Sequence, residues 1–520
     1  MTAPGQDPLD QGPWDALVIG AGLGGGTLGR ALAEAGQKVL FVEQGRAGLR
    51  SERNGLSEIF VPEARLARGL WPEPLHVTLD GVEQAFYAPL GAGVGGSSAF
   101  YAATLERPER HDLDDSAARP HPSGGWPVGF DAMAPWYARA ARMYRVHGSA
   151  DPLSAEEPLP LRAPPALSRM EEGLMVSLRA RGLHPYHAPT AVDRVADCEN
   201  CLGRKCPKPC KMDGRSAGVE PALATGKAAL LEGAQVLRLV ANGDMIDHAE
   251  VLVGGQKHRL RARRYILCGG ALGSARLLLA SASEAWPTGL ANRSGLVGRN
   301  LMFHLNEMFA VWPKGPDEGA TKAIALRDFY HRDGQRLGTV QAMGIRASYG
   351  EILFYLNRML TQRGLSRLQP AARLPAALAQ RMLGGAQVFV GLMEDLPYPE
   401  NRVTFDRAQP ARLSVTYRLS DELKARRRAF RTAIRKGFRG HRRLFLGVAP
   451  ELNWGHPCGT LRFGTDPARS VLRPDCRSHD VTNLWSADAG FMPTSMGVNP
   501  GLTVAANALR VARVILTEET

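Results

Sequence analysis

Long hydrophobic runs are missing from this chain of 520 residues. No stretch approaches the roughly 20 apolar residues that a membrane-spanning helix needs, so we expect no transmembrane segment. Cysteine is scarce, with 7 residues in the chain, which excludes a small scaffold built on disulfides. Residues Met1 to Trp14 have neither an apolar core nor paired arginines and do not resemble a secretory signal. We therefore expect a cytoplasmic protein, with export on a signal-bearing partner subunit as the open alternative.

Acidic residues are fewer than basic ones, 51 against 64, which leaves a net charge of +13. Such an excess suits nucleic acid, an anionic membrane, an acidic partner or an anionic cofactor. The densest basic run, from Ser420 to Arg443, has hydrophobic residues at helical spacing and predicts an amphipathic helix with a cationic face. That face is either solvated or a docking surface. No nucleic-acid-binding module is recognisable, so we expect no nucleic acid partner.

Glycine, in contrast, is abundant, with 57 residues, and the first group of glycines follows a predicted buried strand. Residues 15–20 form an apolar run that leads into Gly20, Gly22 and Gly25, then a helix-like stretch and a second strand that ends at Glu43. In this order Gly20 permits a tight turn, Gly22 lets the backbone approach a pyrophosphate, and Gly25 lets helix and strand pack closely. The carboxylate of Glu43 can accept hydrogen bonds from ribose hydroxyls. The pattern predicts a dinucleotide site rather than an ordinary glycine turn.

Two further glycine groups lie at residues 91–98 and 265–274. Successive glycines in the first group, which ends in Ser97 and Ser98, let the backbone pass close to a flat or anionic ligand and leave hydroxyl groups available. The second group has the order of a buried strand, a glycine turn and a helix, for which a structural role is favoured. Near the C-terminus another apolar strand ends at Asp488.

In their order along the chain, these motifs resemble the glucose–methanol–choline (GMC) family of FAD-dependent oxidoreductases. The most specific part is the C-terminal block, from His456-Pro-Cys-Gly-Thr to Val498-Asn-Pro. The resemblance covers nearly the whole chain, with a poorly matching middle at residues 313–387. It implies an α/β fold (α+β overall), with a discontinuous Rossmann-like FAD-binding domain and a substrate domain of sheet and helices. The implied FAD-binding segments are 1–124, 191–305 and 449–520, and the implied substrate segments are 125–190 and 306–448.

The resemblance also implies which residues bind FAD. They are Gly20, Gly22, Gly25 and Glu43 at the ADP half, Gly95, Gly96 and Ser98 along the flavin and pyrophosphate, Val236 at the adenine edge, Asp488 and Ala489 near the ribityl–pyrophosphate region, and Asn499 and Thr503 near the flavin ring. One position departs from the family pattern, because Tyr101 stands where members often have an asparagine against the flavin. The local flavin contacts and the reactivity with oxygen are therefore left open.

The same resemblance places His456 at the position of the family's catalytic histidine and Asn499 at that of its partner. Oxidation of an alcohol requires removal of the hydroxyl proton, and a histidine can act as base near neutral pH. Asn499 would then orient and polarise the alcohol. The alternative for His456 is a structural histidine with its hydrogen bonds satisfied.

Four of the cysteines, Cys198, Cys201, Cys206 and Cys210, lie close together in a segment rich in arginine and lysine. Thiolates at such intervals can converge on one metal centre, and nearby cations offset the negative charge of a cluster. The loop resembles that of bacterial FAD-dependent glucose dehydrogenases, which implies a [3Fe–4S] or [4Fe–4S] cluster, although Cys198 is displaced by two positions from that pattern. Zinc, a disulfide and free thiols remain as alternatives.

The activity expected from the resemblance is that of an FAD-dependent dehydrogenase acting on the CH–OH group of an alcohol or sugar. Electrons would pass to an external acceptor through the iron–sulfur cluster, with an electron-transfer partner protein. The alternatives are a GMC alcohol oxidase that uses oxygen and a non-redox lyase on the same scaffold. The residues do not identify the substrate. In the poorly matching middle, residues 360–383 predict a packed amphipathic helix rather than a mobile lid.

Overall fold

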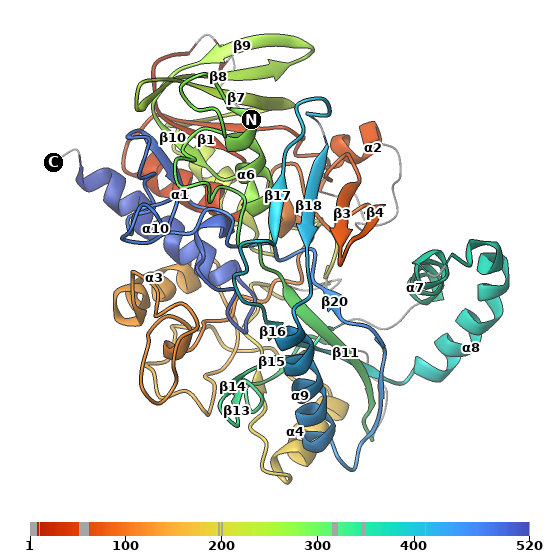
Figure 1. Cartoon of the computed structure of the whole chain (residues 1–520). Helices are drawn as coiled ribbons and strands as arrows, with labels where there is room; N and C mark the ends of the chain where they lie inside the picture. The colour runs from red at the N-terminus through yellow and green to blue at the C-terminus, as the bar shows by residue number, and fades with distance from the viewer. Residues whose placement is uncertain are drawn as a thin grey trace.

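A five-stranded parallel sheet organises the upper half of the molecule (Figure 1). The computed structural model describes residues 8–9, 11–50, 62–195, 198, 201–314, 321–344, 349–362, 364–410 and 412–518. The strand order is β21–β10–β1–β2–β6, and every pairing is parallel. These strands are β1 (Trp14–Ile19), β2 (Val39–Glu43), β6 (Ala228–Glu232), β10 (Ala262–Leu267) and β21 (Leu484–Ser486). The predicted α/β class with a Rossmann-like sheet is confirmed.

Helix α1 lies unusually close to its neighbours because it begins with several glycines. A Cβ atom on Gly24 would stand 2.0 Å from the carbonyl oxygen of Ala487, and one on Gly25 would stand 2.1 Å from that of Gly20. The close contact at Gly25 is the packing expected from the sequence. α1 packs against α10, which in turn packs against α3. The helices of this half are α1 (Leu23–Glu34), α3 (Phe130–Met143), α5 (Glu220–Ala224) with a π-helix before it (Gly214–Val219), α6 (Gly270–Ala280) and α10 (Gly501–Thr517).

Two smaller sheets flank the parallel sheet. One is an antiparallel sheet at the top of Figure 1, and the other has the order β17–β18–β3–β4. In the second, β3 pairs with β18 in parallel, so a strand expected in an FAD-binding segment lies beside one expected in a substrate segment. The proposed domain boundaries stay a prediction. The elements are β7 (Ala234–Asn242), β8 (Met245–Val253), β9 (Gln256–Leu260), β3 (Leu75–Leu79), β4 (Val82–Phe86), β17 (Arg402–Thr404), β18 (Leu413–Tyr417) and the nearby α2 (Pro62–Ala67).

A seven-stranded antiparallel sheet forms the lower half, in the order β19–β11–β16–β15–β12–β5 with β20 also on β11. Helix α9 packs on this sheet, and Phe430 fits against Gly391 of β16, where a Cβ would lie 2.6 Å from the phenylalanine ring. The strands are β5 (Tyr186–His187), β11 (His304–Trp312), β12 (Ile324–Leu326), β15 (Gly338–Ala342), β16 (Gln387–Glu394), β19 (Arg442–Phe445) and β20 (Glu451–Leu452). Near them lie α4 (Arg169–Arg179), α9 (Asp421–Gly437) and the pair β13 (His331–Arg332) and β14 (Gln335–Arg336). The chain also has 3-10 helices at Gly96–Phe100, Arg110–Asp112 and Ala489–Phe491, of which the first contacts α1 and the last contacts α6.

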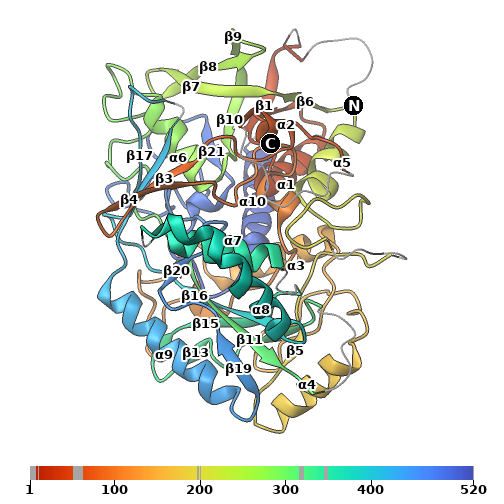
Figure 2. The ribbon, with the colours of Figure 1, turned by 90° about the vertical axis from the view of Figure 1, so that its right-hand side faces the viewer.

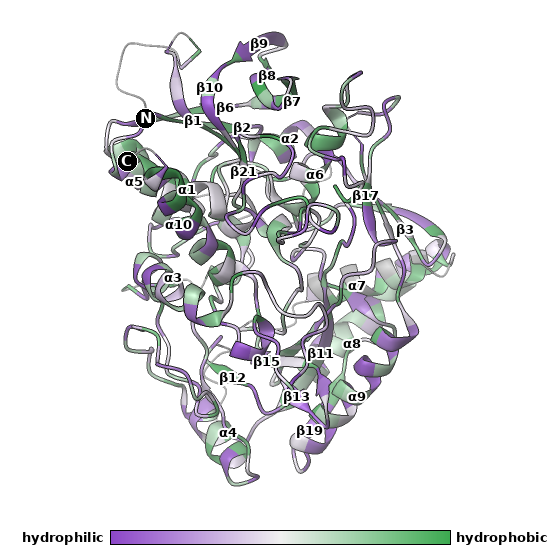
Figure 3. Cartoon of the chain, turned by 60° about the vertical axis from the view of Figure 1, so that its left-hand side comes forward, coloured by the Kyte–Doolittle hydropathy of each residue, from purple (hydrophilic) through white to green (hydrophobic). Residues whose placement is uncertain are grey.

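Helix α9 is the basic amphipathic helix expected after Ser420, but part of its charge is internal. Arg427 and Arg431 contact the buried carboxylate of Glu307 on β11 at 3.0 and 2.6 Å. Arg426 donates to the carbonyl oxygen of Glu394 at 2.8 Å. Figure 3 colours much of α9 purple, for hydrophilic residues, and these hydrophilic residues include the buried arginines that contact the sheet. The expectation of a single free cationic face is corrected, because helical spacing does not reveal an acid on a distant strand.

The segment expected to form one packed helix forms a helical hairpin instead. It consists of α7 (Tyr349–Gln362), a 3-10 helix (Ser366–Ala372) and α8 (Arg373–Leu383). Figure 1 shows the hairpin standing away from the rest of the chain, and Figure 2 shows it in front when viewed from that side. Within the described ranges no helix has both the length and the apolar character needed to cross a bilayer.

Candidate functional site

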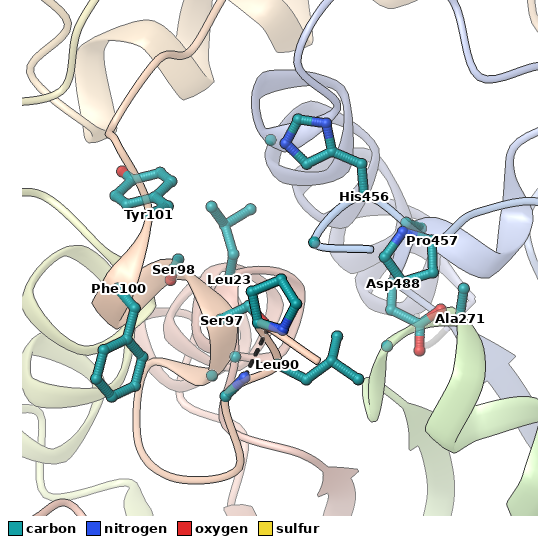
Figure 4. Close-up of a pocket in the computed structure, with 18 of the residues that line it drawn as sticks. Leu23, Leu90, Ser97, Ser98, Phe100, Tyr101, Ala271, His456, Pro457 and Asp488 are labelled. Carbon is teal, nitrogen blue, oxygen red and sulfur yellow. Dashed lines mark hydrogen bonds between the residues drawn. The ribbon is translucent and has the colours of Figure 1, made fainter. Parts of the chain in front are cut away.

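A cavity of about 860 Å³ is lined by residues from both halves of the molecule. Its walls combine the turn after β1, the glycine loop at residues 91–98, strands β11, β15 and β16, and the C-terminal block. Figure 4 shows His456 and Asp488 on one side, with Ser98 and Tyr101 on the other. Residues that the sequence spreads over the whole chain therefore meet around one space.

Gly20 and Gly22 line this cavity where β1 leads into α1. Gly20 has a φ of +104°, a conformation that favours glycine. A Cβ on Gly22 would meet nothing nearer than the Cα of Gly96 at 3.8 Å, so its side-chain position is open. Because Gly22 is the N-cap of α1, the free amide groups at the helix start favour an anion such as a phosphate here.

Glu43 lies buried at the end of β2 and also lines the cavity. Its carboxylate accepts hydrogen bonds from the amides of Ala21 (2.8 Å) and Gly45 (3.1 Å). Burial raises the pKa of Glu43 against the effect of these bonds. Val236 of β7 lines the same cavity, and β7 packs against β2. The part of the cavity at Glu43 and Val236 therefore has the two groups expected there, a carboxylate for the ribose and the backbone of Val236 for the edge of the adenine.

The glycine loop is fixed to the turn after β1, because the amide of Gly95 donates to the carbonyl oxygen of Ala21 at 2.8 Å. Ser98 donates to the carbonyl oxygen of Gly95 (2.6 Å) and accepts from the amide of Gly214 (2.9 Å). Gly96 and Ser98 line the cavity, whereas Gly95 does not. The hydroxyl of Ser98 thus shapes the loop, and Gly95 acts through its backbone.

The C-terminal block brings Asp488, Ala489 and Asn499 to the cavity but leaves Thr503 outside its lining. Asp488 accepts from the hydroxyl of Ser274 at 2.5 Å and from the amide of Gly490 at 2.8 Å. Burial raises the pKa of Asp488 to about 6. Thr503 is buried in α10 beside the hydroxyl of Tyr137.

His456 pairs with a second histidine, His304, at the start of β11. Their Nδ1 atoms are 3.2 Å apart. His304 Nε2 must carry a proton because it lies 3.0 Å from the carbonyl oxygen of Met496, which can only accept. Burial lowers the pKa of His304 to about 4, so the ring is neutral near pH 7 and its Nδ1 is bare. The proton between the two rings then belongs to Nδ1 of His456.

This arrangement leaves Nε2 of His456 without a proton and without a hydrogen-bond partner among the described residues. Burial first, and then the neighbouring His304 and Lys322, hold the pKa of His456 well below its ordinary value. Asn453 Nδ2 also lies 3.3 Å from His456 Nδ1, but two donors face each other in this tautomer, so that contact is not a hydrogen bond. The ring is therefore a neutral base at pH 7.

Asn499 is oriented by Gln341 of β15, whose Nε2 donates to Asn499 Oδ1 at 2.8 Å. This bond fixes the orientation of the Asn499 amide, and its nitrogen is available to donate at the cavity that the residue lines. A hydroxyl oxygen could lie between this donor and the base.

Three polar residues of the cavity were not anticipated from the sequence, namely Asn306, Lys322 and Gln341. Asn306 Oδ1 and Gln341 Oε1 are buried without a hydrogen-bond partner in the described part of the chain. Lys322 Nζ makes a 3.4 Å contact with the carbonyl oxygen of Ala342, and burial lowers its pKa to about 8. No motif marks these residues, because Asn306 lies in β11, Gln341 lies in β15 and Lys322 lies just before β12.

In the cysteine loop, Cys201, Cys206 and Cys210 form one buried cluster, with the sulfur atoms of Cys206 and Cys210 3.3 Å apart. Cys198 is only partly buried. Burial raises the pKa of Cys206, but the thiol of Cys210 and backbone amides outweigh it and lower the pKa overall. Across the described residues, no three or more histidine, cysteine or acidic side chains are arranged to hold a metal ion. The geometry therefore does not support the expected iron–sulfur cluster.

The cysteine loop is also attached to the cavity. The buried ammonium of Lys211 donates to the carbonyl oxygens of Cys201 (3.0 Å) and Ala99 (2.9 Å), and so joins this loop to the glycine loop. Leu202 and Arg204 line the cavity. Tyr101 lines it too, and its hydroxyl donates to the carbonyl oxygen of Met212.

The residues present fit FAD. Open space beside Gly22 at a helix start suits a pyrophosphate, and the carboxylate of Glu43 suits a ribose. The cavity continues from this end to His456 and Asn499. Most of the residues expected to bind FAD therefore line one cavity. Gly25, Gly95 and Thr503 do not belong to its lining.

Comparison with known proteins gives a family for the chain. Two family models described as GMC oxidoreductase match it, one over residues 14–306 and the other over residues 397–508. Paromamine 6'-oxidase of Streptomyces fradiae is 28% identical over 97% of this chain and 92% of its own length. The 2-methyl-1,2-propanediol dehydrogenase of Mycolicibacterium austroafricanum is 27% identical over 96% of this chain and 95% of its own. The crystal structure of pyridoxine 4-oxidase from Mesorbium loti has the same fold, with a TM-score of 0.63, 19% identity, and coverage of 96% of this chain and 99% of that chain.

Proposed function

Because the chain belongs to the GMC oxidoreductase family, we propose that it oxidises a CH–OH group of a polyhydroxylated alcohol or sugar, with His456 as the base. Bound FAD supplies the hydride acceptor. The observation that carries the proposal is the contact of His456 Nδ1 with His304 Nδ1 (3.2 Å), which leaves Nε2 of His456 available as the base at a cavity that continues to the dinucleotide cradle. The base takes the hydroxyl proton, and Asn499 holds the oxygen.

The polar wall of the cavity supports a substrate with several hydroxyl groups. Asn306 Oδ1 and Gln341 Oε1 are acceptors without partners in the described structure. The side chains of both residues line the cavity, and their amide groups are of a type that can exchange hydrogen bonds with hydroxyl groups. The ammonium group of Lys322, which also lines the cavity, can donate to an oxygen of such a substrate. The names of the two enzyme relatives give paromamine and 2-methyl-1,2-propanediol as their substrates, and the second is a diol, which agrees with this class.

An anaerobic panel of alcohols, diols and sugars tests the proposal by the loss of flavin absorbance. We expect one or more polyhydroxylated compounds to bleach the flavin. Peroxide formed after the addition of oxygen then separates an oxidase from a dehydrogenase. A flavin that dithionite reduces but no compound of the panel bleaches would count against alcohol oxidation and favour the non-redox alternative.

An iron–sulfur cluster in the cysteine loop is a separate proposal. Its support is that three thiols share one buried cluster. The pKa of Cys206 is lowered, whereas burial raises the pKa of Cys201 and Cys210, so iron would have to displace the protons of the latter two thiols. Such a cluster would take electrons one at a time to an acceptor protein. The arrangement of the thiols without metal does not itself form a metal site, so binding would require the loop to close around the iron.

Iron analysis of anaerobically reconstituted protein checks this loop. We expect about three or four iron atoms per chain, with an EPR signal, and loss of both in Cys206→Ala. The matched control is Cys476→Ala, which removes a buried cysteine outside the cluster and should keep the iron. If reconstituted wild-type protein contains no iron, the cysteines have another role.

A further inference from the structure

The outer stripe of helix α8 is apolar and exposed to solvent. Leu374, Leu378 and Met382 recur every four residues and so lie along one side of the helix. Their exposed fractions are 80%, 61% and 51%. In contrast, Ala376 of the same helix is fully buried. The helix thus presents three large apolar side chains to solvent while the small Ala376 faces the protein, the reverse of an ordinary surface helix.

Arginines run beside this stripe. Arg373 and Arg381 lie one position before Leu374 and Met382, and Arg367 lies in the preceding 3-10 helix next to the exposed Leu368. None of these three arginines forms an ion pair with a described residue. The sequence from residue 352 to residue 393 contains five arginines and no acidic residue. The surface is therefore apolar and cationic at once.

We propose that the α8 stripe binds the surface of an anionic lipid bilayer. An amphipathic helix whose apolar face enters the boundary between headgroups and acyl chains, with arginines at the phosphate level, satisfies both features. The hairpin stands away from the body of the molecule (Figures 1 and 2), so it can reach a flat membrane without hindrance from the rest of the chain.

A protein partner fits the same surface less well. Protein interfaces are rich in tyrosine, tryptophan and phenylalanine, which fill pockets at their centres, and residues 364–383 contain no aromatic side chain. The charge of one sign complements anionic phospholipids, each arginine near such a surface adding to the attraction.

The connection of the hairpin to the protein relates this surface to the cavity. The chain leaves for the hairpin just after Met343 and returns in β16, and Met343, Val390 and Leu392 all line the cavity. The indole nitrogen of Trp312 on β11 also donates to the carbonyl oxygen of Met382 at 3.2 Å. Docking through α8 therefore holds the wall of the cavity close to the membrane.

Co-sedimentation of the FAD-loaded full chain with vesicles tests the proposal. We expect binding to phosphatidylcholine vesicles that contain about 30% phosphatidylglycerol, and weak binding to pure phosphatidylcholine. Replacing Leu374, Leu378 and Met382 together by serine should lower the partition coefficient at least about tenfold. Arg373→Gln with Arg381→Gln should lower it only on the anionic vesicles, as should about 0.5 M salt.

The matched control replaces three exposed valines elsewhere, Val82, Val176 and Val448, by serine; their exposed fractions are 66%, 64% and 80%. This variant should bind as the wild type does, and bound FAD confirms the folding of every variant. Wild-type protein that ignores the anionic vesicles overturns the proposal, as does unchanged binding of the serine variant of the stripe. If the stripe variant instead converts a wild-type dimer into a monomer, with no vesicle binding by either, the stripe joins two copies of the chain.

Discussion

Replacing His456 by alanine lowers the rate constant of flavin reduction by substrate by about 10²–10⁴-fold, the range that a positioned general base contributes. The reason is that the unprotonated Nε2 of His456 has no equivalent, since His304 uses Nε2 to hold a backbone carbonyl. Binding of FAD should persist, because the cradle around Gly22 and Glu43 is separate from this ring. Anaerobic stopped-flow mixing measures the rate.

The pH dependence gives a second readout of the same base. Since burial and the neighbouring charges lower the pKa of His456, the ring stays unprotonated through neutral pH, and the rate falls only as the solution becomes acidic. The variant should lose this acidic limb. His258→Ala, on β9 and outside the cavity lining, should keep both rate and limb. A His456→Ala enzyme with a near-normal rate would assign the proton transfer to another group.

Replacing Gly22 by valine should produce folded protein that no longer retains FAD, with an affinity at least about 100-fold weaker because a branched side chain fills the phosphate space. The fold should survive, because a Cβ on Gly22 approaches no atom closer than 3.8 Å and the backbone there is extended. Flavin content after gel filtration and the circular dichroism spectrum measure the two effects.

Gly385→Val is the matched control for this change. Gly385 is exposed, and a Cβ there would meet no atom within 4 Å, so its FAD content should equal that of the wild type. Gly24→Val should instead destabilise the folded protein, because a Cβ at this position would lie 2.0 Å from a backbone oxygen. Full flavin content in Gly22→Val would place the pyrophosphate elsewhere.

The sequence predicts the dinucleotide half well because each role there is local. A buried strand, a glycine turn, a helix and an acid must follow one another in the chain, so Gly20, Gly22 and Glu43 can be recognised together and indeed line one cavity. The histidine–asparagine pair was found through a family motif. His304 was not predicted as a partner of His456, because the two residues become neighbours only after β11 and the C-terminal block have folded together.

The lower half is less predictable because its roles depend on long-range packing. Helical spacing identifies α9 but not that Glu307 neutralises two of its arginines. The same spacing indicates an amphipathic segment at residues 360–383 but not which side faces the protein. Asn306 lies in β11 and Lys322 lies just before β12, and neither segment carries a motif. Only the folded structure shows that the two residues share a cavity.

The position of β21 has a consequence for biosynthesis. This strand, residues 484–486, pairs with β10 in the sheet that begins with β1 at residues 14–19, and α10 then packs against α1. While the polypeptide emerges from the ribosome, the first strands must wait for almost the entire chain before their sheet and their helix layer are complete. Until then an unpaired strand edge and apolar surface are open to aggregation. The sheet and helix layer around the dinucleotide site are therefore complete only when nearly the whole chain has been synthesised.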